Sequence, residues 1–236
     1  MKIKKVIRNI IGDTLTGGID YYRFPHLKQQ DTTFTSQKKR KQIFEELIQK
    51  IKFEMIIETG TFRGTTLEYF HDVSGLPCIS IEKNKRCFGY SFMRFFMNNN
   101  VKIYNNDSRY IISKLTHNKS FTQIKTLFYL DAHWNSDLPL FEELELILLN
   151  WKNYVIIIDD FEVPMDDGYG FDNYGKGKKL SLKYLLGLPL DDVSLFFTNI
   201  DSQIETGRRK GYIIICNDEL ANMLHSIKNL IKYNFT

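Results

Sequence analysis

Short apolar runs alternate with longer segments of helical spacing from Ile43 to the end of the chain. The first five runs of β-branched and aromatic residues are almost continuously apolar, which is typical of parallel strands covered on both faces. Right-handed crossovers between them predict an α/β fold with a doubly wound, mainly parallel, seven-stranded sheet. The predicted strands are Glu54–Glu58, Cys78–Glu82, Val101–Asn105, Thr126–Asp131, Tyr154–Asp159, Ser194–Thr198 and Tyr212–Cys216.

The connection between the last two predicted strands differs from the others. Residues 199–211 are polar, contain Gly207 and Gly211, and lack a helical pattern. This segment predicts a long hairpin, so the last strand should run antiparallel to an otherwise parallel sheet.

Residues 1–42 precede the alternating pattern. In residues 1–11, Ile and Val recur at helical spacing beside three lysines and Arg8, which predicts a first helix. Such a helix packs on its own domain or makes weak contact with an anionic membrane surface or a partner. Residues 12–42 show little periodicity. We therefore expect an N-terminal helix and irregular cap at 1–42, followed by one domain at 43–236.

Composition limits the class of protein. With 236 residues and 43% hydrophobic residues, the chain can bury a substantial core. The net charge of +4 gives no strong nucleic-acid signal. Three cysteines without a metal-binding spacing favour a reducing compartment, so we expect a cytoplasmic protein, with peripheral membrane contact as the alternative. A homo-oligomer remains open.

The clearest motif is a strand that enters a glycine-containing turn before a helix, with the spacing Glu58-x-Gly60-x-x-x-Gly64. Gly60 would let the backbone approach a ligand, and Gly64 would open a helix whose free N–H groups face that ligand. The spacing lacks the second close-approach glycine of a pyrophosphate-binding loop, which disfavours NAD. The alternative is a turn shaped only by packing.

Polar residues follow the next two predicted strands as well. Glu82 closes the second strand, where a carboxylate can accept hydrogen bonds from both hydroxyl groups of a ribose. Asp107 and Ser108 follow the third strand. We expect these residues to face the same ligand as the glycine turn.

Three further carboxylates follow the fourth and fifth strands. Asp131, Asp159 and Asp160 would lie together at the carboxyl edge of the sheet, and hard oxygen ligands in this number suit Mg²⁺. Asp159 and Asp160 can face one ion only if the chain leaves extended geometry between them; otherwise Asp160 caps a turn or helix. His133 lies two residues after Asp131 and would project to the same side, where a neutral imidazole can act as a general base.

These motifs resemble class I S-adenosylmethionine (SAM)-dependent methyltransferases. The carboxylate pattern is similar to that of the metal-dependent macrocin O-methyltransferase type, which methylates sugar hydroxyls. The resemblance implies SAM as cofactor and Mg²⁺ at Asp131, Asp159 and Asp160, close to the methyl donor. Together with the position of His133 beside Asp131, it leads us to expect His133 and Asp131 as the catalytic residues. It implies the following cofactor-binding residues: Glu58, Gly60, Thr61, Phe62, Gly64, Thr65, Glu82, Asp107, Ser108 and Asp131.

The resemblance leaves the acceptor open. The sequence has Ala132-His133-Trp134 where the family has a Gly-Asp-like continuation. We expect transfer to a hydroxyl of a small molecule or sugar. The alternatives are a metal-independent N- or RNA methyltransferase and a non-catalytic binding or interaction protein.

Two segments are rich in aromatic residues, and we expect the first to face substrate and the second to belong to the core. Tyr169, Phe171 and Tyr174 lie in a glycine-rich segment directly after the carboxylates, where they can offer flat faces to a substrate ring. In the helical segment Cys87–Phe96, phenylalanines recur at helical offsets and are interpreted as core residues.

Overall fold

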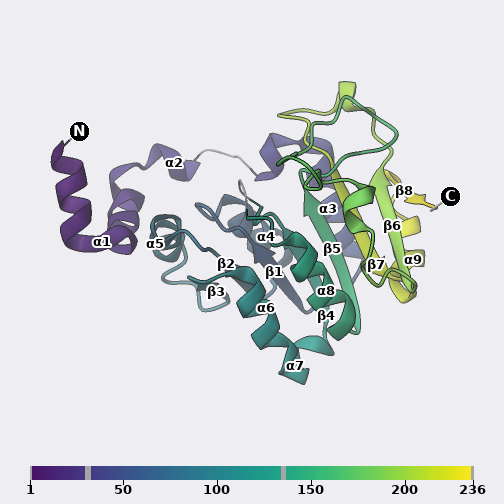
Figure 1. The fold of residues 1–236 in the computed structure, drawn as a ribbon, viewed down its shortest axis with the longest axis horizontal. Helices are drawn as coiled ribbons and strands as arrows, with labels where there is room; N and C mark the ends of the chain where they lie inside the picture. Colours follow the sequence, from purple (N-terminus) through teal and green to yellow (C-terminus); the bar gives the residue numbers. More distant parts are fainter. Residues whose placement is uncertain (1, 30–32, 134–136, 235–236) are drawn as a thin grey trace.

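One eight-stranded sheet forms the centre of the protein, with strand order β3-β2-β1-β4-β5-β7-β6-β8 (Figure 1). This computed structural model describes residues 2–29, 33–133 and 137–234, with side chains from residue 12 onward except residue 29. The strands are β1 (Met55–Thr59), β2 (Cys78–Ile81), β3 (Val101–Tyr104), β4 (Lys125–Leu130), β5 (Asn153–Asp159), β6 (Val193–Thr198), β7 (Tyr212–Asn217) and β8 (Leu230–Tyr233).

The predicted topology is confirmed. The first five strands are parallel, and β7 lies antiparallel between β5 and β6. All seven predicted strands are present. The sheet adds β8, which pairs antiparallel with β6 at the edge. This strand has four residues, of which only Leu230 is buried, as only Val101 is in β3 at the opposite edge.

Helices cover both faces of the sheet (Figure 1). Residues of α3, α4 and α9 pack into one apolar cluster, and residues of α6 and α8 pack into a second cluster. Along β5, Val155 and Ile157 belong to the first cluster, whereas Ile156 and Ile158 belong to the second. This alternation is expected for a strand that is buried on both sides. The helices are α1 (Lys2–Arg23), α2 (His26–Gln29), α3 (Lys38–Lys50), α4 (Thr65–Ser74), α5 (Lys85–Arg94), α6 (Ser108–Thr116), α7 (Lys119–Thr122), α8 (Leu140–Asn150) and α9 (Asp218–His225), with short 3₁₀ turns at Thr33–Ser36, Leu182–Leu185 and Ser202–Ile204.

Much of the segment that was expected to be irregular is helical. The backbone of α1 is interrupted at Gly12, where φ is 76°, and continues as helix to Arg23. This second half packs on α5 through glycines: a Cβ at Gly17 would lie 2.0 Å from the carbonyl oxygen of Arg86, and one at Gly89 would lie 1.9 Å from that of Thr14. The two backbones therefore meet at a distance that only glycine permits.

The aromatic helix contributes to the core only in part. Phe95, at the C-terminal end of α5, is 7% exposed and belongs to the first apolar cluster, whereas Phe92 is 44% exposed and Phe96 is 60% exposed. Gly89 and Tyr90 are buried on the face of α5 that contacts α1, so Phe92 and Phe96 face outward.

The hairpin between β6 and β7 is fastened to the start of α3. The Glu205 carboxylate accepts hydrogen bonds of 3.1 Å from the backbone N–H groups of Lys39 and Arg40, which caps the helix. A Cβ on Gly207 would lie 2.1 Å from the Thr35 carbonyl oxygen. The expected boundary between residues 42 and 43 thus falls inside a helix that is tied to the C-terminal part of the sheet.

All three cysteines are unpaired. Among the described residues, no helix combines the length and apolar character that a membrane crossing requires.

Candidate active site

The loop after β1 makes a tight turn that contacts the end of β4. Gly60, Phe62 and Gly64 have positive φ angles of 87°, 48° and 76°, in a region that suits glycine and is costly for phenylalanine. A Cβ at position 60 would lie 2.3 Å from the carbonyl oxygen of Asp131. The predicted glycine turn is present, and its first glycine brings the ends of β1 and β4 together.

The end of this loop opens α4. A Cβ on Gly64 would lie 2.7 Å from the ring of Phe95, so glycine allows the start of the helix to pack on that ring before Thr65 begins the helix. Phe62 is 49% exposed, and the Arg63 guanidinium lies 4.8 Å from its ring centroid. The loop therefore presents a flat apolar face beside a helix N-terminus.

Glu58 lies beneath the loop rather than at its surface. It is 1% exposed, and its Oε2 accepts a 2.5 Å hydrogen bond from Ser80 Oγ. Ser80 Oγ lies 2.5 Å from Thr61 Oγ1, which is then the donor of the second bond. Burial raises the pKa of Glu58 to about 8. Glu58 is thus linked to Thr61 of the loop by two hydrogen bonds through the Ser80 hydroxyl.

Glu82 lies directly after β2 and holds the same loop. Its Oε2 accepts a 2.7 Å hydrogen bond from the Phe62 N–H, and its Oε1 accepts a 2.6 Å bond from the Asn84 N–H. Burial raises the pKa of this carboxyl group. Because each carboxylate oxygen can accept two hydrogen bonds, Glu82 keeps one acceptor position on each oxygen for ligand hydroxyl groups.

Asp107 is engaged by neighbouring cations. It caps α6, and its carboxylate accepts hydrogen bonds from Arg109 Nε at 2.8 Å, Arg109 Nη2 at 2.7 Å and Lys83 Nζ at 2.9 Å. Arg109 and Lys83 hold the pKa of Asp107 well below its usual range. Ser108 follows it and is buried. Asp107 therefore orients two cationic side chains at the end of β3.

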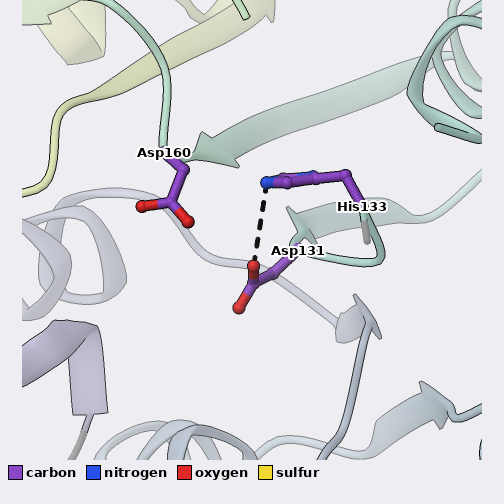
Figure 2. A group of neighbouring side chains, drawn as sticks. All are labelled: Asp131, His133 and Asp160. Atoms are coloured by element: carbon purple, nitrogen blue, oxygen red, sulfur yellow. Dashed lines mark ion pairs between the residues drawn. The ribbon is translucent and has the colours of Figure 1, made fainter. Parts of the chain in front are cut away.

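Asp131, His133 and Asp160 converge at the carboxyl ends of β4 and β5 (Figure 2). Each offers one ligand atom, and these atoms all lie within 4.8 Å of one another. His133 Nε2 lies 3.8 Å from Asp131 Oδ1 and has no hydrogen-bond partner among the described residues, although the residue is only 3% exposed. We call this group the Asp–His–Asp cluster. Trp134 lies outside the described residues.

Asp159, the third expected metal ligand, lies outside the cluster. Its Oδ1 accepts a 2.6 Å hydrogen bond from Arg40 Nη1 and a 2.8 Å bond from the Asp160 N–H, and its Oδ2 accepts a bond from the Tyr129 hydroxyl. Asp160 has a positive φ of 51°, so the chain does leave extended geometry between the two carboxylates. The turn separates them: Asp160 joins the cluster, and His133 takes the place that was expected for Asp159.

Burial and mutual repulsion shape the ionisation of the cluster. Burial, together with the nearby Asp159 and Asp160 carboxylates, raises the pKa of Asp131 well above its usual range. Burial and Asp159 raise the pKa of Asp160 to about 6. Burial lowers the pKa of His133, which favours the neutral imidazole. A cation would relieve the repulsion between the carboxylates, and a neutral imidazole is the form that binds a metal ion.

A second layer of side chains holds the cluster in place. Lys210 Nζ lies 3.0 Å from Asp160 Oδ1 and 2.7 Å from Asp172 Oδ1. The Tyr174 hydroxyl lies within hydrogen-bond distance of the His133 carbonyl oxygen, at 2.9 Å, and of Asp172 Oδ2, at 2.5 Å. Asp172 and Tyr174 thus help to hold the residues of the cluster. Tyr169, expected to face substrate, is buried, and its hydroxyl donates to the Ile200 carbonyl oxygen.

Sequence reasoning did not assign Arg40, Lys210 or Asp172 to the site. Arg40 lies in the run Lys38-Lys39-Arg40-Lys41, which has the composition of an exposed helix face, and Lys210 follows two arginines in a segment interpreted as a hairpin. The number of carboxylates could have indicated such partners, because acidic side chains that are buried together at one edge of a sheet require cationic side chains nearby.

The fold is similar to that of solved O-methyltransferases. An O-methyltransferase from Bacillus cereus in complex with SAH gives a TM-score of 0.57 at 16% identity, over 92% of this chain and 98% of that chain. The O-methyltransferase TomG from Streptomyces achromogenes, involved in tomaymycin synthesis and solved with SAM, gives 0.55 at 13% identity, over 92% and 96%. The protein therefore has the class I methyltransferase fold. No protein-family model and no curated protein matches the sequence.

Proposed function

We propose that the protein transfers the methyl group of SAM to a hydroxyl oxygen of a small molecule or sugar, with a divalent cation at the Asp–His–Asp cluster. The main support for this proposal is that the cluster lies next to the loop after β1. The cluster, with its buried and unpartnered His133 Nε2, lies at the strand next to the β1 loop. The strand order reverses between β1 and β4, and ligands of open parallel sheets bind at the carboxyl ends of strands at that point.

The cofactor would lie across the ends of β1, β2 and β3. Glu82 would accept hydrogen bonds from the two ribose hydroxyl groups with its free acceptor positions. The turn from Gly60 to Thr65 would surround the amino-acid end of the cofactor, and Ser108, at the start of α6, would lie near the adenine. Glu58 would act indirectly, because it reaches the loop only through Ser80.

The acceptor would be deprotonated and aligned at the cluster. Asp131 and Asp160 offer oxygen ligands and His133 offers a nitrogen ligand, a donor set that fits a divalent cation. Such an ion would lower the pKa of an acceptor hydroxyl and orient its oxygen. The protein itself would hold the acceptor in line with the methyl group, which removes an entropic barrier of up to about 7–11 kcal/mol.

Lys210 favours a second candidate, a metal-independent reaction. Its ammonium group already lies 3.0 Å from Asp160 and offsets part of the local negative charge. In that case the neutral His133 would itself accept the proton of the acceptor. The acceptor could then be a nitrogen or an RNA base.

A methyl-transfer assay separates the two candidates. We expect SAM-dependent methylation within a panel of sugars and catechols, loss of activity in EDTA, and recovery when a divalent ion is returned. Asp131→Asn and Asp160→Asn should each lower kcat/KM at least ~100-fold, whereas Asp167→Asn, an exposed acid nearby, should leave it unchanged. Methylation of RNA or amines that EDTA does not affect would favour the second candidate and overturn the first.

A further inference from the structure

Arg40 removes Asp159 from the set of available cation ligands. The ion pair between Arg40 and Asp159 is buried, with side-chain exposures of 2% and 6%. Asp159 Oδ1 accepts hydrogen bonds from Arg40 and from the Asp160 N–H, and Oδ2 accepts one from the Tyr129 hydroxyl. Asp159 supplies none of the ligand atoms that lie within 4.8 Å of one another, and a cation that displaced Arg40 from Oδ1 would leave the guanidinium buried without a counter-ion.

The guanidinium of Arg40 is fixed by aromatic rings on its other sides. Its carbon lies 4.8 Å from the ring centroid of Phe34 and 4.4 Å from that of Tyr212. The α3 N-terminus that carries it is capped by Glu205. Arg40 is therefore held from the N-terminal segment, from β7 and from the hairpin, and it cannot move away without disturbing all three.

The charges around the cluster leave an excess that one divalent cation would balance. Four carboxylates, Asp131, Asp159, Asp160 and Asp172, face two cationic side chains, Arg40 and Lys210. With a neutral His133 and all four carboxylates ionised, as cation binding requires, the formal excess is two negative charges. The unpartnered nitrogen of His133 is turned toward Asp131, and the Asp160 carboxylate lies beside both (Figure 2).

We propose that the Asp–His–Asp cluster selects a later transition-metal ion, such as Co²⁺, over Mg²⁺, because Arg40 withholds Asp159 and His133 supplies a nitrogen in its place. Mg²⁺ prefers oxygen ligands, whereas imidazole nitrogen suits transition metals. This inference rests on the proposed metal-assisted function. Arg40 acts as a positioning residue, since it determines which carboxylate remains available.

Ion binding to the full chain tests the selectivity without an acceptor or turnover. We would measure the dissociation constants of CoCl₂ and MgCl₂ by equilibrium dialysis and follow the visible absorption of bound Co²⁺. The wild-type protein should bind Co²⁺ at least ~10-fold more tightly than Mg²⁺. His133→Asp, which makes the ligand set all oxygen, should reduce this ratio at least ~10-fold and change the Co²⁺ spectrum. His26→Asp, at an exposed histidine, is the matched control.

The carboxylates give the complementary test. Asp131→Asn and Asp160→Asn should weaken Co²⁺ binding ~10–100-fold, whereas Asp159→Asn should change it less than ~3-fold. Equal affinity of the wild-type protein for the two ions, or loss of binding in Asp159→Asn as large as in Asp160→Asn with the fold intact, would overturn the selectivity and leave metal-assisted transfer standing. Absence of binding of either ion would overturn both. The wild-type ratio decides the matter even where a variant fails to fold.

Discussion

Glu143 is a buried carboxyl group outside the proposed chemistry. It lies in the first turn of α8, is 1% exposed, and its Oε1 has no hydrogen-bond partner among the described residues. Burial raises its pKa to about 7. When folding raises the pKa of a carboxyl group, the free energy of unfolding falls as the pH increases from the unfolded pKa to the folded pKa. Over this range the unfolded state loses the proton, whereas the native state must keep it or hold a poorly solvated charge.

Glu143→Gln should therefore stabilise the protein in a pH-dependent way. The free energy of unfolding of the variant, relative to wild type, should increase between about pH 4.5 and pH 7, by at most ~1.4 kcal/mol per pH unit, and level off above that. Urea denaturation at pH 5 and pH 8 measures this difference. Glu142→Gln, at the exposed neighbouring residue, should show no such trend. An equal difference for Glu143→Gln at both pH values would contradict the explanation.

The sequence predicts which polar residues lie at the edge of the sheet, but not which of them are engaged by other side chains. The strand-end positions of Asp131, Asp160 and Glu82 follow from apolar runs, because parallel strands end at one edge of the sheet. The engagement of Asp159 does not follow, since it depends on Arg40, 119 residues away in the sequence. Local pattern identifies polar groups at an edge, but long-range pairing decides which of them are available.

In the contact between α1 and α5, glycines lie within the helices and allow them to pack closely. Gly17 and Gly18 lower helix propensity, which is why residues 13–23 lacked a clear helical pattern. In the structure Gly17 allows close approach to the backbone of α5, and Gly18 lies against the side chain of Met93. The central strands, by contrast, are predictable because burial on both faces requires apolar runs. The two edge strands, β3 and β8, each bury one residue, and only β3 was predicted.

Gly17→Ala should separate α1 from the body of the protein. Alanine favours helix by ~1 kcal/mol over glycine, yet its Cβ would overlap the Arg86 carbonyl, and overpacking of this kind costs ~1–3 kcal/mol. We expect faster proteolysis and faster hydrogen exchange within residues 13–23, with the sheet unaffected. Leu15→Ala, at a side chain that is 57% exposed, is the control. Unchanged protection in Gly17→Ala would show that the helices do not pack as described.

The whole molecule joins segments that are distant in sequence around one sheet edge. The N-terminal segment supplies Arg40, the hairpin supplies Lys210 and Glu205, and the central strands supply the Asp–His–Asp cluster. From α3 onward, these contacts tie the N-terminal segment to the hairpin and to the end of β5. Membrane contact through residues 1–11, a cytoplasmic location and the oligomeric state remain predictions.

Calorimetric titration of the protein with SAM and SAH is the most direct test of the central claim, that the ends of β1 and β2 bind an adenosyl cofactor. We predict one molecule of either compound bound per chain, and at least ~10-fold weaker binding in Glu82→Gln, which loses charge-assisted hydrogen bonds worth about 1.5–3 kcal/mol each. Glu54→Gln, at an exposed residue before β1, should bind as wild type does. Failure of the wild-type protein to bind either compound, or unchanged affinity in Glu82→Gln, would contradict the account.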